Sequence, residues 1–212
     1  MKLFKIMLAV LLLSGIFVAQ DFEGYLKYNV KGDKGEAMAI TYYKKGDMVK
    51  MEPEITQQIS IIMKDGKTYM VMPAQGMYME FDSKISEQIN EADSIKKPVK
   101  TGETKTILGY EAEKWIFEDA NYTSEIWASD KLGKFVALSS PMQRNQMPDW
   151  YSEIVDNNFF PLLIEAKDKD GSIAGSMEVV EITPTPLKDG FFEIPEGYKK
   201  LEMPAGANQF GR

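Results

Sequence analysis

The 212-residue sequence contains no cysteine and no histidine. Without cysteine, the chain cannot form disulfides, use a thiol nucleophile, build a cysteine–zinc site or carry the lipid-modified cysteine of a bacterial lipoprotein. Without histidine, it lacks the commonest general base and the commonest side-chain metal ligand. We therefore expect the protein to fold and act with no metal and no cofactor.

Arginine is nearly absent too, since Arg144 and Arg212 are the only two in the chain. Acidic residues outnumber basic ones by 32 to 25, which gives a formal net charge of −7. An acidic chain with so few guanidinium groups is poorly suited to phosphate backbones. We therefore expect no nucleic acid among its partners.

Motifs of known catalytic mechanism are missing as well. The chain has no glycine-rich phosphate loop and no strained nucleophile turn. Paired carboxylates could in principle act as the acid and base of a glycosidase. The candidates fall at strand and turn positions that usually face water, where they keep an acidic protein soluble: Glu111, Glu113, Glu118, Asp119 and Glu125. We predict that the protein is not an enzyme.

The clearest apolar run lies at the N-terminus. Lys2 and Lys5 precede uninterrupted apolar residues from Ile6 to Leu13, and small residues follow up to Ala19. This order is typical of a secretory signal peptide, and the run is too short to span a bilayer comfortably. We predict a signal peptide at 1–20, cut after Ala19 or Gln20, a single domain at 21–204 and a flexible tail at 205–212. The mature protein should be soluble, periplasmic or extracellular, and not membrane-spanning.

A β-hairpin is predicted for residues 109–129. Trp115 and Phe117 are two apart, the residues from 122 to 128 also alternate, and Trp127 falls on the opposite face from its neighbours. The break between the strands is the polar stretch 118–121, whose Asp and Asn tolerate turn conformations. Because both faces carry large apolar side chains, we expect this hairpin inside a curved sheet rather than at its edge.

Alternating segments joined by short turns fill the rest of the chain. Six of them form an antiparallel meander, with Asp65-Gly66 as the strongest hairpin signal: 22–30, 36–45, 48–54, 57–64, 67–73 and 77–82. Further strands are predicted at 134–138, 159–168 and 172–184, while the polar stretch 93–104 is expected to be a surface loop. Apolar residues three or four apart predict short helices at 83–92 and 148–155.

Several of these segments resemble known families. GYEAEKWIF, EIWASDKLGKF, FFPL and FEIPEGYKK occur in this order and resemble a secreted bacterial domain family of unknown function related to the LolA-like lipoprotein-carrier superfamily. The hairpin DGKTYMVMP is similar to one in that superfamily. The resemblance covers 22–204, and it implies a mostly β fold: a curved antiparallel sheet forming an incomplete barrel, two short covering helices and an apolar cavity between them. The carrier's helix before its first strand has no counterpart here.

Methionine is unusually frequent, with 14 residues in the chain. Flexible thioethers suit a pocket that adapts to acyl chains, an ordinary soft core, or a copper(I) site. The three tryptophans could form an aromatic rim around a ligand or anchor the core. The predicted lining of an apolar cavity comprises Met63, Met70, Met72, Met77, Met79, Trp115 and Trp127.

Two functions follow from these patterns. The first is a non-enzymatic secreted or periplasmic protein of the bacterial envelope that binds an apolar ligand, a lipid or acyl chain. The second is a structural or sensory envelope module that binds another protein through its sheet edge, with the sheet interior packed as a core.

Overall fold

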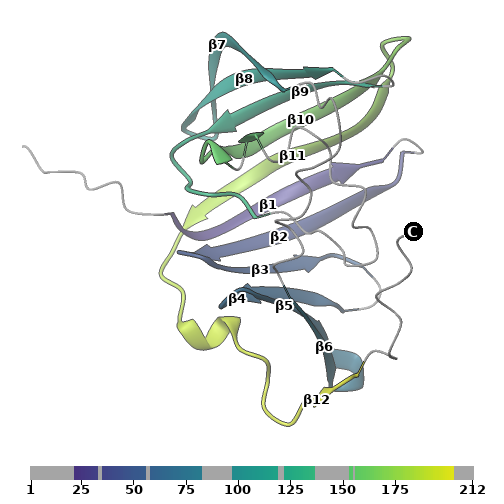
Figure 1. Cartoon of the computed structure of the whole chain (residues 1–212), viewed down its shortest axis with the longest axis vertical. Coiled ribbons are helices and arrows are strands. Elements are labelled where there is room, and N and C mark those ends of the chain that lie inside the picture. The colour runs from purple at the N-terminus through teal and green to yellow at the C-terminus, as the bar shows by residue number, and fades with distance from the viewer. Residues whose placement is uncertain are drawn as a thin grey trace, which may run out of the picture.

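A single twelve-stranded sheet makes up most of the molecule, in the order β12-β6-β5-β4-β3-β2-β1-β11-β10-β9-β8-β7 (Figure 1). The computed structural model describes residues 22–32, 35–55, 58–82, 97–118, 122–136, 153–154 and 156–202. The strands are β1 (Glu23–Lys31), β2 (Ala37–Lys45), β3 (Met48–Pro53), β4 (Ser60–Lys64), β5 (Lys67–Met72), β6 (Met77–Asp82), β7 (Val99–Ile107), β8 (Tyr110–Glu118), β9 (Tyr122–Ser129), β10 (Phe160–Asp168), β11 (Ile173–Pro184) and β12 (Lys199–Lys200). Two 3₁₀ turns, η1 (Pro73–Gln75) and η3 (Asp189–Phe192), complete the described elements.

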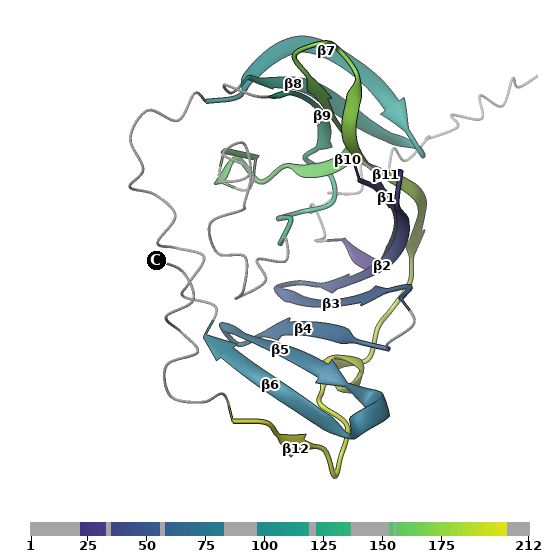
Figure 2. The same cartoon turned by 90° about the vertical axis from the view of Figure 1, so that its right-hand side faces the viewer.

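The sheet is strongly curved and open. Its neighbouring strands are antiparallel, except that β12 runs parallel to β6. β7 and β12 occupy the two ends of the strand order, and they do not pair with each other. The sheet bends into an arc with one concave and one convex face (Figure 2). The predicted mostly β class, a curved antiparallel sheet forming an incomplete barrel, is confirmed.

Short turns set the register of the N-terminal meander. Lys64 pairs with Lys67 across Asp65-Gly66, and both turn residues have positive φ, 53° and 70°. These dihedrals belong to the primed two-residue turns whose twist matches a hairpin. The six strands predicted between residues 22 and 82 are therefore present, with ends shifted by at most a few residues.

The concave face holds the larger part of the core. Leu26, Tyr42 and Met51 lie side by side in one cross-strand row and are almost fully buried. Phe135 stacks on Tyr42 with ring centroids 5.7 Å apart, and Phe160 meets Tyr42 edge-on at 5.5 Å. The segment after β9 and the start of β10 thus fill the inside of the arc at its middle.

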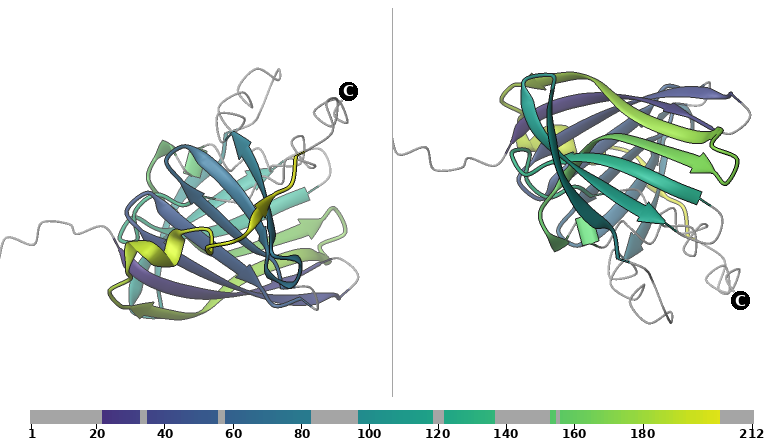
Figure 3. Two further views of the ribbon diagram at one scale, coloured as in Figure 1. Left: turned by 90° about the horizontal axis from the view of Figure 1, so that it is seen from below. Right: turned by 90° about the horizontal axis from the view of Figure 1, so that it is seen from above.

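The C-terminal segment covers the convex face instead. Phe192 of η3 is 0% exposed and packs with Ile62 and Val71. The chain then reaches β6, where Lys199 N donates to Gly76 O at 2.9 Å and Leu201 N donates to Tyr78 O at 2.8 Å. Figure 3 shows this segment crossing the outside of the β3–β6 strands. We call residues 185–202 the C-terminal strap.

Several expectations need correction or lie outside the described residues. The stretch 93–104, expected to be a loop, contains the start of β7, because polar edge strands lack the apolar alternation that marks a buried strand. Residues 134–136 of the strand expected at 134–138 form no strand. The helix expected at 83–92 lies outside the described residues, and so does most of the helix at 148–155, as do the signal peptide and the tail.

Hydrogen bonds on the convex face hold β1 against β11. Tyr25 Oη donates to Glu181 Oε1 at 2.7 Å, and Lys27 Nζ lies 2.8 Å from Glu181 Oε2. The bonds from Lys27 and Tyr25 lower the pKa of Glu181 from 4.5 to about 2. This carboxylate therefore stabilises the seam that joins the meander to the C-terminal strands.

We expect Glu181→Gln to destabilise the protein at neutral pH and to have a diminishing effect in acid. A folded pKa below the unfolded one contributes stability that is complete above about pH 4.5 and is lost as the pH falls toward about 2. Urea unfolding of wild type and variant at about pH 7 and about pH 3 measures the difference. Glu178→Gln, an exposed carboxylate on the same strand, is the matched control. A difference that stays the same at both pH values would contradict the assignment.

Candidate ligand-binding face

Four of the predicted methionines form a continuous patch on the concave face. Met70 pairs with Met79 and Met72 pairs with Met77 directly across β5 and β6. Ile61 of β4 lies beside Met70, in the same row as Met51 and Tyr42. Because directly paired residues share a face of the sheet, the four thioethers point into the arc. We call Met70, Met72, Met77 and Met79 the methionine patch.

Burial decreases along the concave face toward this patch. Met51 and Met63 are buried, and Met63 belongs to the same cluster as Val49 and Tyr42. The methionine patch is only half-buried. None of its four residues belongs to the three buried clusters that the described residues form. The patch thus has the apolar character of a core without the close packing of one.

The other face of the same strands is closed. Ile62 and Val71 are buried beneath Phe192 of the strap, and Tyr69 and Tyr78 pack around them. Among the described residues, the strap thus covers the convex side chains of β4–β6, and no buried cluster includes the methionine patch on the concave side. That asymmetry makes the methionine patch the candidate ligand-binding face.

The two predicted tryptophans lie on opposite faces of the β8–β9 hairpin. Trp115 pairs with Ile126, whereas Trp127 pairs with Lys114. Trp115 packs with Phe117 and Phe159, and its row shares the concave face with the methionine patch. Trp127 lies on the other side, where Lys105 Nζ is 4.0 Å from its ring centroid. By strand register Trp115, not Trp127, shares the sheet face of the patch, while Trp127 is buried in the cluster that also holds Met63 and Tyr42.

The indole N–H groups of these tryptophans also differ. Trp127 Nε1 donates to Glu125 Oε1 at 2.9 Å. Burial acts to raise the pKa of Glu125, but the bonds from Trp127 and Lys114 outweigh it and lower the pKa. Trp115 Nε1 is buried and has no hydrogen-bond partner. A buried donor without an acceptor is costly, so its position calls for an explanation.

Lys100 and Phe159 complete the surroundings of Trp115. Lys100 Nζ lies 4.7 Å from the Trp115 ring centroid and 4.5 Å from that of Phe159. Sequence alternation does not assign either residue to the site: the stretch around Lys100 has the composition of a loop, and Phe159 lies far away in the chain. The spacing of Glu113 and Trp115, two apart in a strand, is the one signal that a carboxylate shares this face.

Among the described residues, no three acidic side chains are grouped so that they could hold a metal ion. No helix in this part of the chain has both the length and the apolar character needed to cross a membrane.

The fold and this face define a class: an open, curved antiparallel β-sheet domain with a half-buried apolar patch on its concave side. A family model described as a domain of unknown function, DUF4412, matches residues 22–198, so the chain belongs to that family. The predicted membership of a domain family of unknown function is thereby confirmed. No match is found among curated proteins.

Solved structures share the fold at low sequence identity. An uncharacterized conserved protein from Thermus thermophilus is similar with a TM-score of 0.50 and 11% identity, over 84% of this chain and 90% of that one. PNGF-II is similar with a TM-score of 0.50 and 14% identity, over 85% of this chain but only 31% of that one. Both likenesses concern the fold alone.

The similarity to a lipoprotein-sorting domain is weak. A domain from Vibrio parahaemolyticus described as an outer membrane lipoprotein-sorting protein aligns over 82% of this chain and 89% of its own length. Its TM-score is 0.27 and its identity 11%, which is too low to support a structural argument.

Proposed function

We propose that the mature protein is a non-enzymatic binding module that holds a long-chain apolar molecule, a lipid or acyl chain, against the methionine patch. The observation that carries this proposal is the asymmetry of β4–β6. Their convex side chains are sealed by the strap, while four thioethers stay half-buried on the concave side. Apolar patches that stay partly accessible commonly mark binding sites.

The energetics suit such a ligand. Burying an acyl chain gains about 0.8 kcal/mol per CH₂ before the costs of ordering ligand and protein. Methionine has three rotatable bonds, so a patch built from it can adapt to chains of different length and bend. Exposed apolar patches are also an aggregation hazard, and a bound ligand would remove it.

The cellular setting is part of the same proposal. The N-terminal pattern of Lys2, Lys5 and the apolar run favours export to the bacterial envelope, and the acidic composition favours a soluble product. In that setting the ligands at hand are lipids and their acyl chains.

A protein partner is the second candidate function, and β7 favours it. β7 ends the strand order, spans nine residues and is exposed along most of its length. An edge strand offers unpaired backbone groups to an incoming strand. Charged side chains on an edge strand discourage pairing with another strand, and β7 carries Lys100, Glu103 and Lys105. We therefore place this candidate second.

The test is fluorescent fatty-acid binding by wild type, Met72→Gln and Met79→Gln. Each change should weaken binding roughly fivefold, about 1 kcal/mol, and cost little stability, because a half-buried amide can keep its water. Met48→Gln is the matched control, since Met48 is half-buried on the convex side beneath the strap. It should leave fatty-acid binding unchanged.

The contrary result is equally clear. A close-packed core would strand the new amide and cost about 1–3 kcal/mol of stability. If wild type shows no saturable binding and both patch variants are strongly destabilised, the patch is a core and the protein-binding candidate moves ahead.

A further inference from the structure

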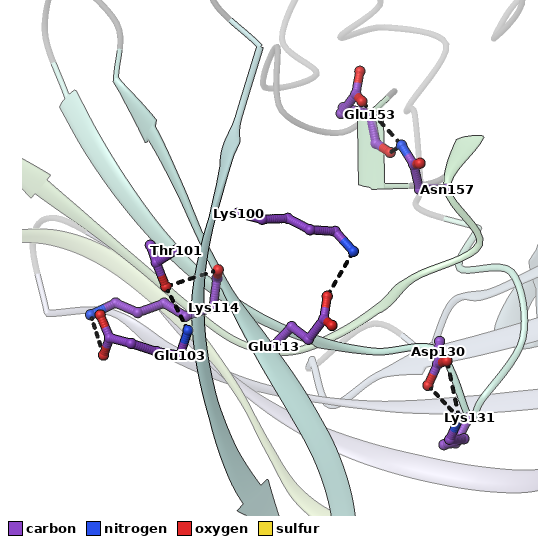
Figure 4. A network of polar contacts seen from close by, with 9 residues as sticks. All are labelled: Lys100, Thr101, Glu103, Glu113, Lys114, Asp130, Lys131, Glu153 and Asn157. Atoms are coloured by element: carbon purple, nitrogen blue, oxygen red, sulfur yellow. Dashed lines mark hydrogen bonds and ion pairs between the residues drawn. The ribbon is translucent and has the colours of Figure 1, made fainter.

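Three side chains surround the ammonium group of Lys100 on the concave face of β8. Its Nζ lies 2.8 Å from Glu113 Oε2 and faces the rings of Trp115 and Phe159. The two rings meet nearly at right angles, 72°, with centroids 5.1 Å apart. Figure 4 shows Lys100 reaching from β7 toward Glu113. We call Glu113, Trp115 and Phe159 the aromatic corner.

The polar atoms of this corner are unusually poorly satisfied. Among the described residues, two side-chain polar atoms are buried without a hydrogen bond, Glu113 Oε2 and Trp115 Nε1, and both are here. The Lys100–Glu113 contact is an ion pair by distance, but its alignment is not that of a hydrogen bond. Trp115 is 3% exposed, so water does not compensate for its missing acceptor. A buried donor left in this state calls for an explanation, whereas the Glu113 side chain as a whole is 40% exposed.

We propose that the aromatic corner is a binding site for an organic ammonium group, and that Lys100 is a tethered occupant which the ligand displaces. Two ring faces and a carboxylate are the surroundings that recognise methylated and primary ammonium groups. A methylated ammonium needs no hydrogen bonds, so it suits a carboxylate oxygen that lacks them. Its methyl groups would also be buried against the two rings, a contact that the unmethylated ammonium of Lys100 does not make.

Lys100 is well placed to leave. It lies on the edge strand, and its side chain is 48% exposed. The pairing of β7 with β8 shifts register between Lys100 and Thr104, so the ladder is interrupted right after Lys100. Moving this side chain into water therefore breaks one ion pair and two ring contacts but leaves the sheet intact.

The indole N–H of Trp115, which lacks an acceptor, favours a ligand that also carries a hydrogen-bond acceptor. Trp115 Nε1 can donate to an acceptor next to the ammonium, such as a phosphate, carboxylate or ester oxygen. The displaced Lys100 ammonium can then balance an anionic charge there. The next step rests on the proposed function. If that function holds, the aromatic corner binds the head group of an amphiphile whose apolar chain lies on the same face of the sheet.

Titration with tetramethylammonium, followed by calorimetry, tests the corner without any apolar chain. Lys100→Ala should bind this ion about tenfold more tightly than wild type, because the internal competitor is gone. Lys100→Ala combined with Glu113→Gln should lose that binding. Lys105→Ala is the matched control, since Lys105 lies over Trp127 on the opposite face. It should behave as wild type. Lys100→Ser is a second variant in case alanine alters the edge strand.

Chain length separates this proposal from the proposed function. Decyltrimethylammonium should bind Lys100→Ala more tightly than tetramethylammonium does if head and chain are both held, and decanoate reports on the chain alone. Tetramethylammonium binding with no decanoate binding would uphold the corner and overturn the apolar-ligand function. Absence of tetramethylammonium binding by both Lys100 variants, or equal binding by the Glu113 double variant, would overturn the corner.

Discussion

Replacing Phe192 by alanine is expected to lower the free energy of unfolding by about 3–5 kcal/mol, the usual cost of removing a fully buried phenylalanine. Phe192 is 0% exposed and fills the convex side of β4 and β5 against Ile62 and Val71. The cavity left behind cannot collapse easily, because β4 and β5 are fixed by their ladders on both sides. Urea unfolding followed by far-UV circular dichroism measures the loss.

Leu201→Ala is the control for this variant. Leu201 lies at the end of the same strap and is 44% exposed, so its truncation should change stability by about 0.5 kcal/mol or less. A Phe192→Ala effect as small as that would mean that the strap does not anchor the convex face. Under conditions where Phe192→Ala stays folded, fatty-acid affinity should persist, because the strap and the methionine patch lie on opposite faces.

Much of the strand content follows from local sequence. Alternation by two locates a strand wherever one of its faces is buried, as in β1 with Leu26 and Tyr28. Asp65-Gly66 fixes a two-residue turn and therefore the register of β4 on β5. The pairing of Met70 with Met79 then follows from the turn after β5. For these strands, local pattern and tertiary structure agree.

The rest of the fold depends on contacts that are distant in sequence. β7 has no apolar stripe, so nothing in its composition distinguishes it from a polar loop. The strap begins as a continuation of β11, and only its contacts with β4–β6 decide which face it covers. β1 pairs with β11 although the paired residues are at least 145 positions apart in the chain, as between Lys31 and Ser176. No turn signal encodes such a pairing.

The same division applies to the candidate site. Alternation predicts that Met70 and Met72 share a face, but it cannot tell whether that face is packed or half-open. Whether that face is packed depends on which other segments of the chain contact it. The aromatic corner is even harder to predict from sequence, because Lys100 and Phe159 come from separate segments and meet only in the folded sheet.

Gly24→Ala is expected to destabilise the protein more than any exposed substitution, by about 1–3 kcal/mol or more. At Gly24, β1 approaches β11 so closely that an added Cβ would lie 2.2 Å from Thr183 O and 2.9 Å from Pro184 Cα. Both are backbone atoms, so no side-chain rotation relieves the clash. Gly24 also has φ of 151°, a conformation that residues with a Cβ rarely adopt.

The clash of the added Cβ can be avoided only if β1 and β11 move apart locally. Gly24 pairs with Pro184 there, and Leu26 pairs with Ile182. This seam joins the N-terminal meander to the C-terminal strands, so its opening should reduce the cooperativity of unfolding as well as its midpoint. Gly190→Ala is the matched control, because an added Cβ there meets no atom within 4 Å. Thermal unfolding of both variants, with hydrogen exchange of the β1 amides, distinguishes the outcomes. Equal midpoints for the two variants would show that β1 and β11 can separate at Gly24 without cost.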